Sequence, residues 1–127
     1  MAVPKLTGAT VTRRDDAVVL TWDVDGDLED PALSPWLLSV MLVGGENGPI
    51  HQVGFRFRDG KVEERFIFDF VETMNYYTPQ VEPQRTGKKW SAVFPVDEKV
   101  SASGSFTAAL SFDEPDNANE TNVEGTF

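Results

Sequence analysis

The feature that most constrains the fold is the alternation of side chains between Val100 and Asp113. Small or apolar residues occupy every second position of this segment, and serine or threonine occupies most positions between them. A period of two residues predicts a β-strand with one face buried and the other in solvent. Trp90 to Val96 alternates in the same way. The polar residues 97–99 between the two segments therefore predict a turn that joins them as a hairpin.

A second hairpin is predicted around Asp59 and Gly60. Asp-Gly suits a two-residue turn of type I′, and alternating segments flank it on both sides. Pairing Arg58 with Lys61 fixes a register in which Glu64 falls on the apolar face. Either the register slips near Glu64, or a carboxylate lies close to the core and needs a partner there. The same register pairs Phe57 with Val62, Arg56 with Glu63, Val53 with Phe66 and His51 with Phe68.

Further strands are predicted along most of the chain, at residues 6–13, 17–23, 36–43 and 50–58. The segment 36–43 is apolar on both faces, which is typical of a central strand. Residues 78–82 are the candidate for a short edge strand, and no segment has the periodicity of an amphipathic helix. Seven or eight strands at hairpin spacing predict an all-β fold, an antiparallel β-sandwich. A closed barrel is the alternative.

The stretch from Leu6 to Asp23 resembles the first two strands of fibronectin type III and related immunoglobulin-like domains. It has a strand rich in threonine and valine, a polar turn, and an apolar run that ends in Leu20-Thr21-Trp22-Asp23. The resemblance implies an immunoglobulin-like sandwich that serves as a binding or spacer module. Two features depart from the family. An acidic run replaces the prolines after the tryptophan, and residues 100–113 lack the tyrosine that the family has near its penultimate strand.

The length of 127 residues predicts one domain. We expect the sandwich to span residues 1–112, with residues 113–127 as an acidic C-terminal tail that is flexible or a loosely docked edge strand. No apolar run approaches the roughly 20 residues of a membrane helix. The first residues lack the pattern of a signal peptide. The sequence therefore predicts a soluble cytoplasmic protein.

The chain has no cysteine and a single histidine, His51. Disulfides, thiolate zinc sites and cysteine nucleophiles are therefore excluded, as is a multi-histidine metal site within one chain. No phosphate-binding loop is present, and no serine has the surroundings of a nucleophile. We expect a protein that is not an enzyme and has no cofactor or metal. An enzyme that uses Glu64 as a buried carboxylate is the alternative.

The net charge of −10 is concentrated in two segments without bases, residues 23–30 and 113–127. Such segments repel nucleic acids and anionic membranes, and they attract a basic protein surface or a divalent cation. The first segment lacks EF-hand spacing, because Leu28 and Ser34 fall where that loop needs glycine and glutamate. Its candidate binding residues are Asp23, Asp25, Asp27, Glu29 and Asp30.

Tyr76 and Tyr77 are adjacent aromatic residues in a polar segment. They either anchor this segment to the core or form an exposed platform for a sugar or a protein. The sequence predicts a non-catalytic protein-interaction module that binds a partner with a basic surface through residues 23–30 and these tyrosines. The alternative is a carbohydrate- or small-ligand-binding domain, linked to calcium. Self-association through an exposed strand edge is left open.

Overall fold

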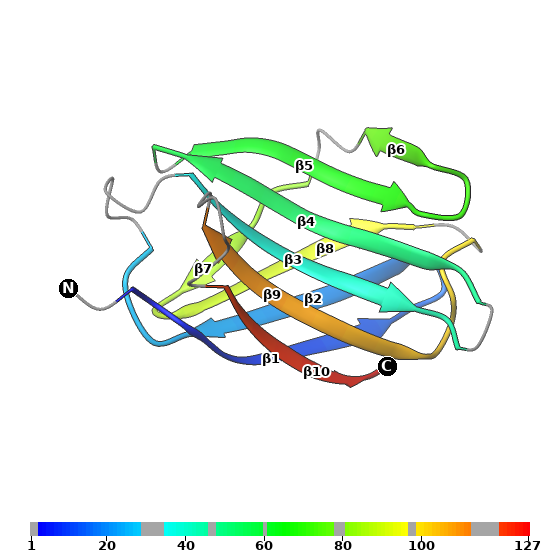
Figure 1. Ribbon diagram of the computed structural model, residues 1–127, viewed down its shortest axis with the longest axis horizontal. Helices are drawn as coiled ribbons and strands as arrows, with labels where there is room; N and C mark the ends of the chain where they lie inside the picture. The colour runs from blue at the N-terminus through cyan, green and yellow to red at the C-terminus, as the bar shows by residue number, and fades with distance from the viewer. Residues whose placement is uncertain are drawn as a thin grey trace.

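The computed structural model of the chain is all-β, and its described residues form ten strands and no helix (Figure 1). The structure describes residues 3–28, 35–45, 48–59, 61–77, 81–96, 99–112 and 120–127, with only the backbone described at 76 and 77. The strands are β1 (Leu6–Arg13), β2 (Ala17–Val24), β3 (Trp36–Val43), β4 (Ile50–Arg58), β5 (Lys61–Asp69), β6 (Met74–Tyr77), β7 (Gln84–Thr86), β8 (Lys89–Pro95), β9 (Ser105–Phe112) and β10 (Thr121–Thr126). In this part of the chain no helix has the length and hydropathy that a membrane crossing requires.

The strands form two antiparallel sheets. One has four strands in the order β1-β2-β8-β7, and the other has six in the order β10-β9-β3-β4-β5-β6. The predicted count of seven or eight strands is too low. The strands that raise it are the short β6 and β7 and the C-terminal β10. The described side chains of β6 and all those of β7 are exposed, and those of β10 are exposed or half-buried, so the alternation that marks a strand in a sequence is weak.

The C-terminal strand β10 belongs to the segment for which the sequence left a flexible tail or a docked edge strand open. It pairs with β9 along its whole length, beginning with Thr121 opposite Leu110. After β10, Phe127 and Gly104 each donate a backbone N–H to the other's carbonyl at 3.0 Å. The six-stranded sheet therefore extends beyond the expected boundary at residue 112. Residues 113–119 lie outside the described part of the chain.

The β4–β5 hairpin begins in the predicted register and then shifts by one residue. Arg58 lies opposite Lys61, but a β-bulge follows, and Arg56 lies opposite Glu64 rather than Glu63. The bulge leaves Glu64 exposed to solvent. Of the two possibilities that the sequence left open, the structure has the slip of register, which keeps this carboxylate out of the core.

The predicted hairpin between residues 90–96 and 100–113 is wrong. β8 pairs with β2 and β7, whereas β9 pairs with β3 and β10 in the other sheet. Alternation predicted both strands but not their partners, because a strand with one buried face has the same pattern in either sheet. The connection crosses between the sheets and reaches β9 at Gly104. A Cβ atom there would lie 2.1 Å from the carbonyl oxygen of Val43, so only glycine fits.

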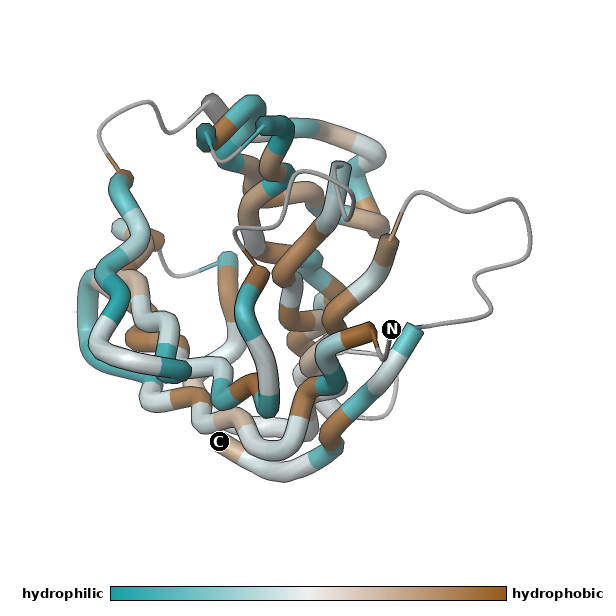
Figure 2. The backbone as a smooth tube through the Cα atoms, turned by 90° about the vertical axis from the view of Figure 1, so that its left-hand side faces the viewer, coloured by the Kyte–Doolittle hydropathy of each residue, from teal (hydrophilic) through white to brown (hydrophobic). Residues whose placement is uncertain are grey.

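The two sheets pack against each other through aromatic side chains. Trp22 of β2 contacts Phe55 of β4 edge to face, with ring centroids 6.2 Å apart. Trp36 of β3 and Trp90 of β8 are 5.4 Å apart. The three tryptophans are 0%, 3% and 8% exposed, so all three lie in the core. Figure 2 shows hydrophobic positions alternating with hydrophilic ones along the tube, as strands that bury one face require.

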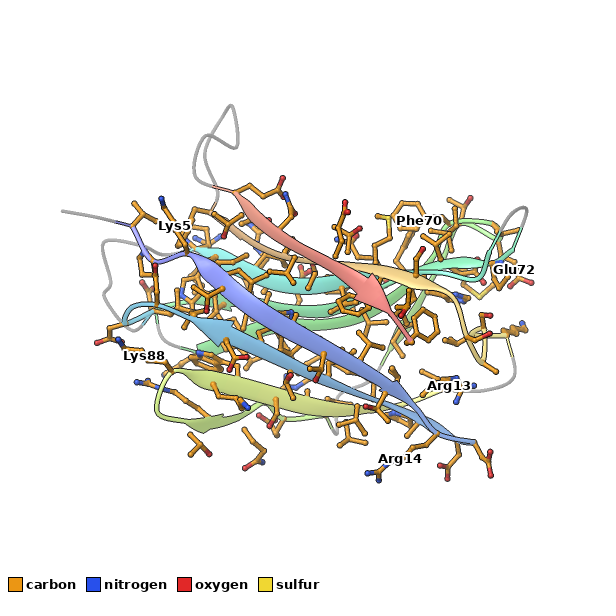
Figure 3. All side chains as sticks on the ribbon, turned by 90° about the horizontal axis from the view of Figure 1, so that it is seen from below. Lys5, Arg13, Arg14, Phe70, Glu72 and Lys88 are labelled. Atoms are coloured by element: carbon orange, nitrogen blue, oxygen red, sulfur yellow. The ribbon has the colours of Figure 1, made fainter. Side chains whose placement is uncertain are left out.

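The sheets adjoin at one pair of edges, where β1 and β10 lie side by side (Figures 1 and 3). The backbone N–H of Leu6 donates to Oγ1 of Thr121 at 2.8 Å across this junction. The other edge strands are β6 and β7, one in each sheet. Edge strands carry unpaired backbone groups, so these two edges are where another chain can add to a sheet.

Candidate functional site

The acidic residues at the end of β2 are occupied by contacts within the chain. Oδ1 of Asp23 lies 3.9 Å from Nζ of Lys89. Oδ1 of Asp25 accepts the backbone N–H of Lys5 at 2.7 Å, and its carbonyl accepts from Nζ of Lys88 at 3.4 Å. Figure 3 shows Lys5 and Lys88 at the same end of the molecule. Lys89 therefore offsets the charge of Asp23, and Lys88 lies close to Asp25.

The structure describes one further predicted residue of this segment. Asp27 is exposed, and Glu29 and Asp30 lie outside the described residues. Within the ranges that the structure describes, no group of three or more histidine, aspartate or glutamate side chains could hold a metal ion. Asp23, Asp25 and Asp27 therefore follow one another in the chain without converging on a common point.

Tyr76 and Tyr77 belong to β6, the edge strand next to β5. Their register partners on β5 are Ile67 and Phe66. The tyrosine side chains lie outside the described part of the structure. The strand that carries these tyrosines therefore forms one edge of the six-stranded sheet, whose outer face is the face turned away from the four-stranded sheet.

That outer face carries large apolar residues on β3, β4 and β5, with the polar Gln52 and Arg56 of β4 among them. The inner positions of β3 and β4 fill the core, and the alternate positions face away from it. The residues that we name the outer apolar face are Leu37, Met41 and Val43 of β3, Ile50 of β4, Phe66 and Phe68 of β5, and Phe70 directly after β5. All are half-buried except Phe70, which is exposed. An antiparallel sheet with one solvated face normally carries polar residues there, so this composition is unusual.

A row of small residues crosses the middle of this face. Ser39 of β3 lies opposite Ala109 on one side and Gly54 on the other. Ser39 and Ala109 are only 3% and 9% exposed, although they face away from the core. The middle of the outer face therefore has small side chains that are themselves hardly accessible to solvent.

The turn between β5 and β6 extends the apolar surface beyond the end of the sheet. Phe70, Val71 and Met74 are 44%, 68% and 49% exposed. The Phe70 ring packs edge to face on Phe68, with centroids 4.8 Å apart, so the turn and the outer apolar face are continuous. Figure 3 shows Phe70 and Glu72 at the end of the molecule opposite Lys5. Large exposed apolar residues that gather in this way are typical of interaction surfaces.

A buried histidine–aspartate pair that the sequence did not predict lies behind this turn. His51 and Asp69 are opposite each other on β4 and β5, with Nε2 3.3 Å from Oδ2. They are 1% and 3% exposed. Oδ1 of Asp69 accepts the backbone N–H groups of Val71 at 2.9 Å and Glu72 at 3.0 Å. The carboxylate therefore holds the turn that presents Phe70 and Val71.

The pKa of Asp69 is lowered from its ordinary value by these contacts. The hydrogen bond from the N–H of Glu72 is the largest cause. Burial opposes it by raising the pKa, while the N–H of Val71 and the neighbouring His51 lower it further. Asp69 is therefore ionised at neutral pH, which lets it accept all of these hydrogen bonds.

The candidate catalytic residues do not form a reactive site. Glu64 is exposed rather than buried, so the alternative of an enzyme built on a buried Glu64 is wrong. The His51–Asp69 pair is almost fully enclosed, and a substrate cannot reach it. Asp69 acts here by accepting the backbone N–H groups of Val71 and Glu72.

Comparison of the chain with protein-family models and with curated proteins gives no match. The site is therefore interpreted from its own geometry.

Proposed function

We propose that the protein is a non-catalytic protein-interaction module that binds its partner through the outer apolar face and the β5–β6 turn. The observation that carries this proposal is the apolar surface that runs from Phe68 to the exposed Phe70 and Val71, with Met41 on the same face beyond Gln52. Removal of such a surface from water is the main favourable term in protein association. Aromatic residues and methionine are also enriched at the centres of interfaces.

The charges of the chain support a partner with a basic rim. The net charge is −10, so a basic partner is steered toward the protein and an acidic one is repelled. At one end of the outer face, Glu63 bridges Arg56 at 3.1 Å and Arg58 at 3.0 Å. This end presents paired charges of both signs, which favours a polar border around an apolar centre.

We also propose that the two sheets form an immunoglobulin-like sandwich of the variable type. Such domains have strands in the order A-B-E-D in one sheet and G-F-C-C′-C″ in the other. When the letters A to G are assigned to the strands along the chain, the two orders become β1-β2-β8-β7 and β10-β9-β3-β4-β5. These are the observed sheet orders, with β6 as an additional strand. The buried Trp36 on β3 supports the assignment, because immunoglobulin domains carry a buried tryptophan on strand C.

Site-specific photo-crosslinking in the cells that make the protein tests the proposed function. A benzophenone amino acid replaces Phe68 on the outer apolar face, or Thr12, an exposed residue of β1 in the other sheet, as the control. We expect a crosslinked product of defined mass from position 68 that position 12 does not give. The second substitution Met41→Ser should reduce its yield. Equal products from both positions, or none from position 68, would contradict the proposal.

A further inference from the structure

A groove lies beside β8, on the four-stranded sheet and away from the outer apolar face. It has a volume of about 360 Å³. Its lining is mostly apolar, with Val19, Val81, Ala92, Val93 and Pro95, and it also contains Glu82, Gln84 and Ser91. Val93 is 54% exposed. The groove opens where β7 has ended and β8 continues, so one edge of β8 borders it.

The backbone of β8 directs hydrogen-bonding groups into this groove. The N–H of Val96 donates to Asp16 and the carbonyl of Lys88 accepts from Val24, each at 3.0 Å. Even-numbered residues of β8 therefore face β2, and odd-numbered residues face β7, because backbone groups alternate along a strand. Ser91 is the last residue that pairs with β7. Within the described residues, the N–H and C=O of Val93 face this edge without a strand partner.

The chain before β7 is held away from Val93 by an arginine of the opposite sheet. If β7 extended in register, Glu82 would lie opposite Val93. Instead, Arg65 of β5 donates its Nε–H to the carbonyl of Val81 and contacts the carboxylate of Glu82 through Nη2. Val81 is 4% exposed. The residues that would complete the edge are thus tied to the other sheet, and the groove stays open between them and β8.

We propose that this groove receives an extended peptide from a partner protein, which adds a strand to the four-stranded sheet at Val93. The peptide backbone exchanges hydrogen bonds with the N–H and C=O of Val93, as in other strand-addition complexes. One apolar side chain of the peptide enters the hollow near Val19 and Val81. Pro95 has no N–H, so it limits the added strand to a few residues.

The charge of the groove argues for a basic peptide as the occupant. Glu82 is the only charged residue among the described residues of the lining, and its side chain is 60% exposed at the rim, where it also contacts Arg65. The chain as a whole carries −10. A lysine or arginine next to the apolar residue of the peptide would therefore be attracted. This site is separate from the outer apolar face, so either proposal can fail alone.

Nuclear magnetic resonance with three synthetic peptides tests the proposal. The probe is acetyl-Lys-Val-Thr-Val-Lys-amide. Two variants of this parent peptide, which we call its twins, have the same sequence but carry backbone N-methyl groups. One is N-methylated at both valines and the other at threonine. Strand addition uses only one edge of the peptide, so one twin should lose about tenfold in affinity, the equivalent of one or two hydrogen bonds. The other twin should bind like the parent. The amide signal of Val93 should shift, and its hydrogen exchange should slow on binding.

Variants at Val93 supply a second measurement. Val93→Pro removes the N–H that faces the groove and should abolish binding, whereas Val93→Thr keeps the backbone and should retain it. The methylated twins remain informative if Val93→Pro does not fold. Three results would overturn the proposal: no shift at Val93, equal binding of all three peptides, or protection of Val93 that depends only on protein concentration. The last result would identify a second copy of this chain as the occupant.

Discussion

Nε2 of His51 lies 3.3 Å from Oδ2 of Asp69 across the β4–β5 pair, with both side chains nearly excluded from solvent. The second carboxylate oxygen of Asp69 accepts two backbone N–H groups of the β5–β6 turn. One carboxylate thus connects the core to the turn that carries Phe70. The conformation of the exposed apolar tip depends on the ionisation of a buried group.

Replacement of Asp69 by asparagine should lower the free energy of unfolding. It should also make this free energy fall less as the pH is lowered. The pKa of Asp69 is below its ordinary value of 3.8 in the folded protein. Its contribution is therefore fully present above pH 3.8 and is lost as the pH falls through the folded-state pKa. The difference in stability between wild type and Asp69→Asn should be largest at neutral pH and should shrink below pH 3.8. Denaturant unfolding at several pH values measures it.

The matched control for this series is Glu124→Gln, which removes an exposed carboxylate from β10. Its unfolding curve should follow that of the wild type at every pH, because an exposed side chain contributes little. A constant difference between wild type and Asp69→Asn from neutral to acid pH would mean that ionisation of this carboxylate does not support the fold.

The sequence did not predict the His51–Asp69 pair because a single bulge shifts the hairpin register. Without it, the hairpin register places His51 opposite Phe68, and nothing then connects the histidine to an aspartate. The predicted register places Glu64 on the apolar face, and this was the one sign in the sequence that the register is wrong. A carboxylate on an apolar face indicated a slip, and a slip of one residue brings His51 to Asp69. The side-chain pattern alone could not say where along the hairpin the slip occurs.

Sequence alternation predicted strands well where one face is buried. Val18, Leu20 and Trp22 alternate along β2, and all three are 0% exposed. β7 was missed because its three residues are all exposed, so no hydrophobic pattern marks it. The short edge strand predicted at 78–82 does not appear at Val81 and Glu82, and residues 78–80 lie outside the described structure.

The candidate site was predicted at acidic residues because charge is visible in composition. The outer apolar face becomes visible only when each strand has been assigned a sheet and a direction for its side chains. Met41 and Phe68 are far apart in the sequence, and each looks like an ordinary core residue. Pairing of β3, β4 and β5 brings them to one surface.

Trp22→Phe should destabilise the protein by about 2–4 kcal/mol. The indole N–H of Trp22 donates to the carbonyl of Ser39 at 3.1 Å and links the two sheets inside the core. Phenylalanine would remove this hydrogen bond between the sheets and also leave a cavity. Trp90→Phe is the control, because Trp90 is 8% exposed near the sheet edge and should cost less. If urea unfolding gave the same loss of stability for both variants, the smaller side-chain volume alone would explain the effect, and the hydrogen bond to Ser39 would contribute nothing.

Gly54→Ala should destabilise the protein by about 1–3 kcal/mol through overpacking. A Cβ at Gly54 would lie 2.2 Å from the carbonyl oxygen of Leu38 and 2.8 Å from Cα of Ser39. Both are backbone atoms of the adjacent strand, so they cannot rotate away. Gln52→Ala, on the same face two residues earlier, should change the unfolding midpoint much less. A wild-type midpoint for Gly54→Ala would mean that β3 and β4 separate easily at this point.

Calcium should not stabilise the protein more than magnesium at the same ionic strength. Asp23 and Asp25 already have partners within the chain, and no described group of three acidic or histidine side chains could hold a metal. A ligand at 100 times its dissociation constant would add about 2.7 kcal/mol, a rise of several degrees in Tm. Thermal melts with calcium, magnesium and EDTA would detect it. A rise specific to calcium that disappears in Asp25→Asn/Asp27→Asn would instead make the segment 23–30 a cation site, and would favour the calcium-linked binding domain over the protein-interaction module.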